Sequence, residues 1–599
     1  MKLIILATTL MIVPVALFAA SAPPDDGWET AFEQSGGMQT PRYEETRAYC
    51  QAIADASPLV HLTSLGHSPQ GRDLMLVIAD RLGRTSPTEI RAAGDVVLLI
   101  QSCIHAGESD GKDASLMLLR DLTVRGELTH LLEHVTVLLM PMFNVDGHER
   151  FGPHNRPNQN GPQEMGWRVT SRNLNLNRDY VKADTGEMQA WLRLYTDWLP
   201  DFFIDAHVSD GADFQYTLMY DLPLRGNLSP GLTRWSRDEY LVGLRDGLAA
   251  DGWPLLEYGG FRNWHDPRSG MNVWLSGPRY SHGYAAIQNR PGLLLETHVL
   301  KPYAERVAGT YAVFLRSLEL MNRDADRLRT LIDTADEHTA SAAFRALPYP
   351  LTFRRDATDS VMIDFLGFDY DMVVSEVTGG SYPVFHRERP ETFHIPQFGS
   401  FRPDAVVVPP EAYLIPPQWT EVIERLERHG VVMEKLDADI DLTVESVRFE
   451  NPTWNEAPYE GHHMLTYSAA PATETRSWPA GTVVIDMAQR AAGVVLHLLD
   501  PAAPDALVRW GFFDAVFERK EYIESYILEP MLPDMLAADP DLAEAWRQAR
   551  EENPALADNH WESLLWFYER SPWWDQGIGA YPVGWIRDRI IVDGLPLAP

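Results

Sequence analysis

The sequence predicts an α/β fold, a mixed β-sheet flanked by helices, followed by a C-terminal mixed α/β accessory region. Between residues 43 and 321, short apolar runs alternate with stretches that have helical spacing of apolar residues. Such alternation is typical of a sheet with helices on both faces. From about residue 346 the chain becomes rich in Pro, Thr and β-branched residues, which indicates a second region.

The elements of the first region follow from these patterns. Apolar runs predict strands at 96–104, 135–140, 202–206 and 293–296. Helical spacing predicts helices at 114–122, 187–199, 237–250 and 304–321, and a charged helical stretch then runs from 323 to 338. Because ligands in open α/β sheets gather at the carboxyl ends of strands, polar residues that follow these strands are the candidates for a site.

The second region has weaker patterns. It contains strand-like runs at 360–364 and 406–408, a helix at 419–429 and an acidic helical part at 505–570. We therefore expect three parts: a signal peptide at 1–22, a catalytic domain at 40–325 and an accessory region of unknown function at 345–599. The length of 599 residues also requires more than one domain.

Composition limits the partners and the compartment. The net charge of −34 argues against nucleic acid and anionic membrane surfaces. One Lys, an apolar run and the small residues Ala19–Ala22 fit a secretory signal peptide, so we expect export to the periplasm or the medium without stable membrane insertion after cleavage. An uncleaved anchor is the alternative. Export permits a disulfide between Cys50 and Cys103, but two buried thiols are the expected state.

Polar residues with metal-ligand chemistry follow the predicted strands. His105 and Glu108 come after the first strand, and His207 ends the third. Nitrogen and carboxylate ligands suit Zn²⁺, and three protein ligands leave a position open, as in catalytic zinc sites. Glu296 lies on the last strand of the region, at the same edge of the sheet. The pattern therefore predicts a catalytic zinc centre.

Other histidines are expected to be structural. His130 and Glu133 form a second His-x-x-Glu pattern at a helix end, where both are ordinary surface residues. His298 follows Glu296 on the same strand face and is expected to be a core residue. His462 and His463 lie in a loop containing Pro and Gly and are expected at its surface.

Six short segments occur in an order that carries more information than any one of them. They are His105-Ala-Gly-Glu108, Asn144-Val-Asp-Gly147, Trp167-Arg168, Asn175-Leu-Asn-Arg178, Phe203-Ile-Asp-Ala-His207 and Leu295-Glu296. This order resembles the zinc carboxypeptidase family, the carboxypeptidase A-like metallopeptidases, over roughly residues 40–325. The resemblance covers about half of the chain.

The resemblance implies a role for each position. One Zn²⁺ per chain would be bound by His105, Glu108 and His207. Glu296 would be the general base, and Arg168 would polarise the scissile carbonyl. The carboxylate of a peptide substrate would be held by Asn177 and Arg178, with Tyr280 as the family's substrate-contacting tyrosine. These roles suit the chemistry, because guanidinium groups bind carboxylates in a bidentate manner and a carboxylate can relay protons.

The chain departs from the family pattern at two places. Asn175 stands where the family often has an Asp that orients the first zinc histidine, and a neutral amide supplies less negative charge. Tyr280 competes with Tyr284 for the tyrosine position, and we favour Tyr280 because 283–288 begins a predicted helix.

The expected function is that of an exported zinc metallocarboxypeptidase. A peptidase of cell-wall peptides, a deacylase of N-acyl amino acids and a non-catalytic zinc-dependent binding protein are the alternatives. Glu296 argues against a pure binding protein, which needs no base. The side-chain preference at the cleaved residue and the oligomeric state are left open by the sequence.

Overall fold

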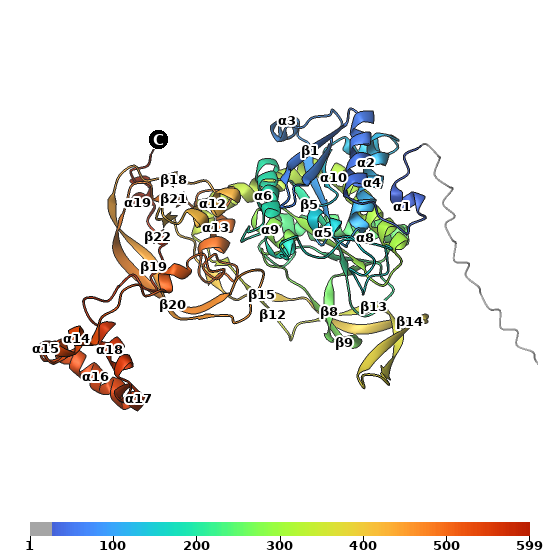
Figure 1. Cartoon of the computed structure of the whole chain (residues 1–599). Coiled ribbons are helices and arrows are strands. Elements are labelled where there is room, and N and C mark those ends of the chain that lie inside the picture. Colours follow the sequence, from blue (N-terminus) through green and yellow to red (C-terminus); the bar gives the residue numbers. More distant parts are fainter. Residues whose placement is uncertain (1–26, 599) are drawn as a thin grey trace, which may run out of the picture.

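The computed structural model describes residues 27–598, so the predicted signal peptide at 1–22 lies outside the described residues. A mixed eight-stranded sheet forms the centre of the α/β region (Figure 1). Its strands, in spatial order, are β1 (Val60–His67), β2 (Asp73–Ala79), β4 (Val135–Met140), β3 (Val96–Ser102), β5 (Phe202–Ser209), β10 (Gly292–His298), β6 (Leu218–Asp221) and β7 (Leu255–Glu257).

The strands that lead to the candidate site are neighbours in this sheet. β3, β5 and β10 run parallel to one another, so their carboxyl ends meet at one edge. Every residue of the three strands is buried. The four predicted strands are confirmed, although β3 ends at Ser102, two residues before the expected end. The chain leaves the sheet there because Cys103 adopts a left-handed conformation, with φ of 57°.

Helices cover both faces of the sheet. One hydrophobic cluster contains residues from α2 (Tyr43–Ala56), α4 (Asp110–Thr123), α8 (Leu241–Ala250) and α10 (Tyr303–Ala340). A second cluster, on the other face, contains residues from α6 (Gly186–Trp198) and α9 (Ser281–Ile287). The smaller helices of the region are α1 (Ala31–Gln34), α3 (Pro87–Ala93), α5 (Val145–Glu149) and α7 (Pro230–Trp235).

Two of the predicted helices differ from the structure in extent. The helix expected at 304–321 and the charged stretch at 323–338 form one continuous helix, α10, because the apolar spacing that faces the sheet continues through the charged part. The helix expected at 237–250 begins with a π-helical turn at Ser236–Tyr240 and continues as α8.

The C-terminal half consists mainly of long antiparallel ribbons. The hairpin of β13 (Val361–Val374) and β14 (Ser381–Phe398) extends a sheet begun by β8 (Gly259–Asn263) and β9 (Asp266–Val273). A six-stranded sheet contains β18 (Glu434–Lys435), β21 (Val483–Asp486), β17 (Ala412–Ile415), β22 (Gly584–Ile586), β19 (Ile440–Trp454) and β20 (Leu465–Trp478). It is accompanied by α12 (Thr420–Arg428), α13 (Ala492–Leu499) and α19 (Arg589–Asp593).

Shorter elements complete the chain. They are α11 (Ala342–Arg345), β11 (Tyr349–Pro350), β12 (Phe353–Arg355), β15 (Phe401–Pro403) and β16 (Val406–Val407). A small helical unit lies apart from the rest at one end of the molecule (Figure 1). It comprises α14 (Ser525–Leu528), α15 (Leu532–Ala538), α16 (Pro540–Glu552), α17 (Pro554–Asp558) and α18 (His560–Tyr568), and it has its own hydrophobic cluster.

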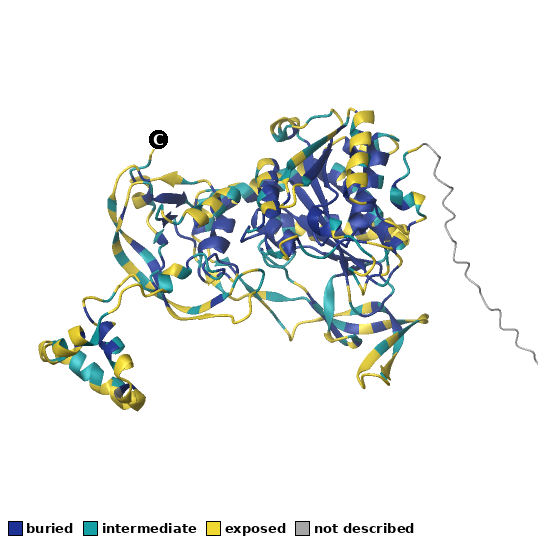
Figure 2. Cartoon of the chain, in the orientation of Figure 1, coloured by how far each residue is buried: buried dark blue, intermediate teal, exposed yellow. Residues whose placement is uncertain are grey.

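The two halves of the chain share a core. The cluster on the α6–α9 face also contains Tyr413 of β17, Ile485 of β21 and Val495 of α13. Figure 2 shows this continuous buried zone between the central sheet and the six-stranded sheet. The division into domains at 40–325 and 345–599 stays a prediction.

Two further properties concern the described residues alone. None of the helices within 27–598 is both long and apolar enough to span a membrane. Both cysteines are buried free thiols, and burial raises the pKa of each to about 12.

Candidate metal centre

The candidate centre forms where the chain leaves β3 and enters α4. The turn after Cys103 carries His105 and Glu108, and α4 begins two residues later at Asp110. Gly107 is needed in this turn, because a Cβ there would lie 2.5 Å from the backbone oxygen of Gly166. The local sequence therefore turns both side chains toward the end of β5.

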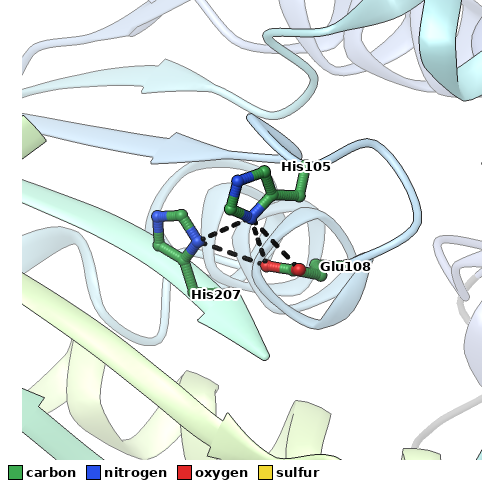
Figure 3. A group of neighbouring side chains, drawn as sticks. All are labelled: His105, Glu108 and His207. Carbon is green, nitrogen blue, oxygen red and sulfur yellow. Dashed lines mark hydrogen bonds and ion pairs between the residues drawn. The ribbon is translucent and has the colours of Figure 1, made fainter. Parts of the chain in front are cut away.

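Three ligand atoms meet at this point, as Figure 3 shows. The Nδ1 atoms of His105 and His207 are 3.2 Å apart. Glu108 places Oε2 3.2 Å from the Nδ1 atom of each histidine. Ligand atoms of one tetrahedral zinc ion, at bond lengths near 2.0–2.1 Å, are separated by about 3.3 Å. The nitrogen, nitrogen and carboxylate donors therefore fit Zn²⁺ in both type and spacing.

Each imidazole ring is oriented by a contact of its Nε2 atom, the ring nitrogen that is not at the centre. The Nε2 atom of His207 lies 2.7 Å from Oδ2 of Asp205, and Nε2 of His105 lies 3.1 Å from Oδ1 of Asn175. With Nε2–H donating to these oxygens, each ring presents the lone pair of Nδ1 to the centre. Asn175 thus occupies the orienting position that the sequence suggested.

Asp205 was missed by the sequence-based analysis. It lies two residues before His207 on β5, so both side chains point to the same face of the strand. It is itself held by Gln101, whose Nε2 donates to Asp205 Oδ1 at 2.9 Å. The two-residue spacing to a candidate ligand was the signal that could have identified it.

The electrostatics of the centre follow from burial and from these partners. Burial lowers the pKa of His105 to about 4, which keeps its imidazole neutral. Burial also opposes the charge on His207, but Asp205 outweighs it and raises the pKa of His207 well above its usual value. Burial would raise the pKa of Glu108, but His105 and Arg156 hold it well below its ordinary range. Glu108 is thus a carboxylate, as a metal ligand requires.

Glu296 lies beside the centre, at the register position of β10 that pairs with His207 on β5. It is 7% exposed, and within the described chain its Oε2 atom has no hydrogen-bond partner. Burial is the main cause that raises its pKa, to about 8. A buried carboxylate oxygen without a partner, next to an open metal position, is available to a water or a substrate.

A cavity of about 490 Å³ opens over the centre. Its lining includes Glu296, Arg168 and two residues that the sequence analysis missed, Arg156 and Tyr258. The Arg156 guanidinium donates to Glu108 Oε1 at 2.6 Å, and Arg168 lies 3.4 Å from the same oxygen. The charge of Glu296, followed by burial, raises the pKa of the Tyr258 hydroxyl well above its usual value. Arg156 lies in a long loop and Tyr258 follows a short strand, and neither carries a pattern in the sequence.

Three predicted substrate-binding residues lie next to one another outside the lining of this cavity. The guanidinium carbon of Arg178 lies 4.5 Å from the ring centre of Tyr280, and Arg178 donates to the backbone oxygen of Asn177 at 2.7 Å. The Oδ1 atom of Asn177 accepts from the Ser281 N–H at 3.2 Å. Tyr284, the competing tyrosine, is fully buried and contacts His429 in the core.

The remaining histidines are structural, with one correction. His130 and Glu133 are exposed, and His298 is buried with Nε2 2.8 Å from the backbone oxygen of Ala212, as expected. The expectation of a surface loop is wrong for His462. It is partly buried, and its Nε2 lies 2.6 Å from Asp184, because the loop packs against the α/β region.

Parts of this chain are similar to known carboxypeptidases. Residues 46–193 match the family model described as zinc carboxypeptidase. Carboxypeptidase 2 of Trichophyton rubrum is 22% identical over 507 residues, which cover 80% of this chain and 85% of that protein. Carboxypeptidase M of Mus musculus is 27% identical over 185 residues, 28% of this chain and 38% of that protein. The crystal structure of carboxypeptidase A from Helicoverpa armigera aligns with 48% of this chain and 74% of its own, with 16% identity and a TM-score of 0.36.

The family model covers the turn with His105 and Glu108, the start of the loop that carries Arg156, and the segment from Asn175 to Arg178. The T. rubrum relative extends the match over most of the chain. Residues 46–193 therefore match a zinc carboxypeptidase domain, and the relatives named carboxypeptidase support a metallopeptidase enzyme.

Proposed function

We propose that this protein is an exported metallocarboxypeptidase that binds one Zn²⁺ through His105, Glu108 and His207 and removes the C-terminal residue of peptides. The observation that supports the metal role most directly is the spacing of three ligand atoms, the two Nδ1 atoms and Glu108 Oε2. Each pair is 3.2 Å apart, which is close to the edge of a zinc tetrahedron. When bound, Zn²⁺ would supply a Lewis acid that makes water nucleophilic near neutral pH.

Glu296 would move the proton in this reaction. Its unpartnered Oε2 can accept a proton from the attacking water and deliver it to the nitrogen of the leaving amine. A raised pKa suits both steps, because a carboxylate with pKa near the working pH accepts and releases protons with similar ease. The buried position keeps bulk water away from the carboxylate during this transfer.

Arg168 would stabilise the negative charge that develops on the carbonyl oxygen. Its side chain is 43% exposed and lines the cavity, so the guanidinium can reach a substrate above the metal position. Fixed positive charge at a developing oxyanion is worth a few kcal/mol in enzymes, about 3 kcal/mol for one donor. Arg156, which contacts the same oxygen of Glu108, adds a second positive group to the cavity lining.

The terminal carboxylate of the substrate would be held by Arg178 and Asn177, with Tyr280 stacked on the guanidinium. A guanidinium suits a free carboxylate because it donates two parallel hydrogen bonds. A C-terminal amide lacks the charge and brings a misplaced donor, so discrimination should be large.

The test compares blocked peptides that end in a free acid with the same peptides ending in an amide. The zinc-loaded protein should cut the acid much faster, and Arg178→Ala should shrink this preference. Arg172→Ala is the matched control, since Arg172 is an exposed arginine of the same segment. Equal cleavage of acid and amide by the unmodified protein would reject carboxylate recognition at Arg178 and favour an endopeptidase. Cell-wall peptides in the same screen, with products identified by mass, cover the alternative substrate class.

Export is part of the proposal and is supported by the N-terminal sequence alone. The mass of the protein recovered from the periplasm or the medium should correspond to a chain that begins near residue 23. Full-length protein retained with the cell membrane would reject cleavage.

A further inference from the structure

One tight turn of the C-terminal half contacts a segment of the candidate site. Residues Tyr459 to His462 form a two-residue hairpin loop, in which Tyr459 N–H donates to the His462 oxygen at 2.8 Å and His462 N–H donates back at 3.0 Å. Both central residues have positive φ, 50° at Glu460 and 85° at Gly461. This is the pattern of a type I′ turn, whose first central position favours Asn, Asp or Gly.

Glu460 therefore has a backbone conformation that glutamate disfavours. A hydrogen bond of its side chain accounts for a glutamate at this position. Its carboxylate accepts a hydrogen bond from the backbone N–H of Asn175 at 2.7 Å. Among the described residues no other hydrogen bond to the Glu460 side chain is observed. A residue held at positive φ needs compensation elsewhere, and this charge-assisted hydrogen bond provides it.

Asn175 links the hydrogen bond of Glu460 to the candidate metal centre. Its Oδ1 lies 3.1 Å from Nε2 of His105 and accepts the Asn177 N–H at 3.0 Å. The backbone position of Asn175 thus sets both the orientation of a candidate metal ligand and the start of the segment with Asn177 and Arg178. Glu460 holds that backbone from the far half of the chain.

The turn is also fixed on either side of Glu460. His462 binds Asp184 at 2.6 Å, and the ring of Tyr459 lies 5.7 Å from the guanidinium carbon of Arg279. Arg279 precedes Tyr280 and is paired with Asp505 at 2.8 Å. The turn therefore contacts both segments that carry the proposed carboxylate-binding residues.

We propose that Glu460 is a positioning residue through which the C-terminal half holds Asn175, and with it His105 and the carboxylate-binding segment, in the geometry needed for zinc and substrate. The inference rests on the proposed function, because it assigns Glu460 to that same site. It gives the accessory half a role in the reaction without placing any of its side chains on the substrate.

The test uses the full-length protein and two substitutions of Glu460, one that removes the acceptor oxygen and one that keeps it. Glu460→Gly suits the positive φ but removes the acceptor, so its melting temperature should equal or exceed that of the unmodified protein. Its zinc dissociation constant, measured by competition with a chelator, should nevertheless rise about 10-fold, as for loss of a group behind a metal ligand. KM for a free-acid peptide should rise as well. Glu460→Gln keeps an acceptor oxygen and should stay within about threefold of the unmodified protein in both measurements.

A double-mutant cycle separates positioning from general packing. Asn175→Ala removes the oxygen that orients His105, so Glu460→Gly should have no added effect on zinc affinity in that background. Glu456→Gly is the matched control, because Glu456 is an exposed glutamate of the same segment. If Glu460→Gly does not fold, Glu460→Asn replaces it, since Asn tolerates positive φ and its shorter side chain withdraws the oxygen.

The outcomes distinguish this inference from the proposed function. Unchanged zinc affinity in Glu460→Gly, or an equal loss with and without Asn175, would overturn the role of Glu460 while leaving the peptidase reaction intact. Zinc binding without cleavage of any peptide would end the proposed reaction, and zinc affinity would still decide the role of Glu460. A protein that binds no zinc would overturn both.

Discussion

The strands that hold the candidate metal centre and the ribbons of the C-terminal half differ in what fixes their side chains. In β3, β5 and β10 every residue is buried, so the sheet fixes His207 and the start of the turn that carries His105 and Glu108. In β20, half-buried and exposed residues alternate between two buried ends, and Figure 2 shows much exposed surface on the long ribbons. The C-terminal half reaches the site only through side chains at a turn. The candidate metal centre thus depends on the central sheet, whereas the proposed carboxylate-binding segments also depend on an interface between the two halves.

A second difference lies within the C-terminal half itself. The six-stranded sheet shares a hydrophobic cluster with α6 and α9, whereas the unit of α14–α18 has a separate cluster. Proximity in sequence is therefore a poor guide to which accessory elements support the catalytic region.

Ending the chain after Ala346 should prevent folding of the α/β region. Tyr284 and Ile287 would lose their cover, since Tyr284 contacts His429 and the backbone of Ile287 lies against Gly493. The loss should exceed about 5 kcal/mol, the lower end of the stability of whole domains. Solubility and circular dichroism measure it, and a chain that lacks only α14–α18 is the control. A truncated protein that melts near the temperature of the full-length protein would show that the α/β region folds without the C-terminal half.

His207→Ala should abolish zinc binding and peptidase turnover, since two ligands cannot hold the ion in a catalytic site. Metal analysis of the purified protein gives the answer. His130→Ala, at the exposed second His-x-x-Glu pattern, should keep its zinc. Full zinc occupancy in His207→Ala would reject the assignment of the centre.

Glu296→Gln should lower turnover at least about 10²-fold while zinc content stays unchanged, because the amide keeps the size of the side chain but accepts no proton. Single-turnover rates measure the loss of turnover, and metal analysis shows whether the zinc content is unchanged. Near-normal turnover would mean that another group is the base, and Tyr258 in the same cavity would be the next residue to test.

Asp184→Asn should weaken the interface in a pH-dependent way. Burial would raise the pKa of Asp184, but hydrogen bonds from His462 and Lys182 outweigh it, so the pKa lies below its ordinary value. A carboxyl group with a lowered folded pKa contributes stability above its unfolded pKa near 3.9, and loses it as the pH falls through the folded value.

The expected effect of this substitution is about 2 kcal/mol at pH 7. It should shrink below about pH 4, where Asp184 of the unfolded chain takes up a proton while the folded protein still holds a carboxylate. Melting temperatures from pH 7 to pH 3 measure it, with Asp326→Asn on an exposed part of α10 as control. If Asp184→Asn lowers the melting temperature by the same amount at every pH, the charge of Asp184 is not the cause of the lost stability.

The sequence was most informative where burial is complete. The runs at 96–104 and 202–206 could be assigned to strands because residues buried on both faces give continuous apolar runs. His105, Glu108, His207 and Glu296 could then be placed at one edge from strand ends alone. Tyr280 was preferred over Tyr284 from the position of α9, and the structure places Tyr280 against Arg178.

The rest depended on contacts between distant segments. Arg156 meets Glu108 from a loop of irregular conformation, and Glu460 meets Asn175 across 285 positions of sequence. Neither residue has a periodic pattern, since long-range contacts between loops leave no spacing in the sequence. His462 was assigned to a surface loop for the same reason, because nothing in its neighbours indicates the approach of Asp184.

The pairing of Glu296 with His207 across β10 and β5 has a consequence for how the enzyme would fail on heating. β10 is also paired with β6, and a slip of one residue would turn Glu296 to the opposite face of the sheet. Glu296 therefore lies either beside His207 or on the opposite face of the sheet, with no position between the two. Substitutions that loosen the core should reduce the number of competent molecules, whereas the rate of each remaining molecule should stay the same.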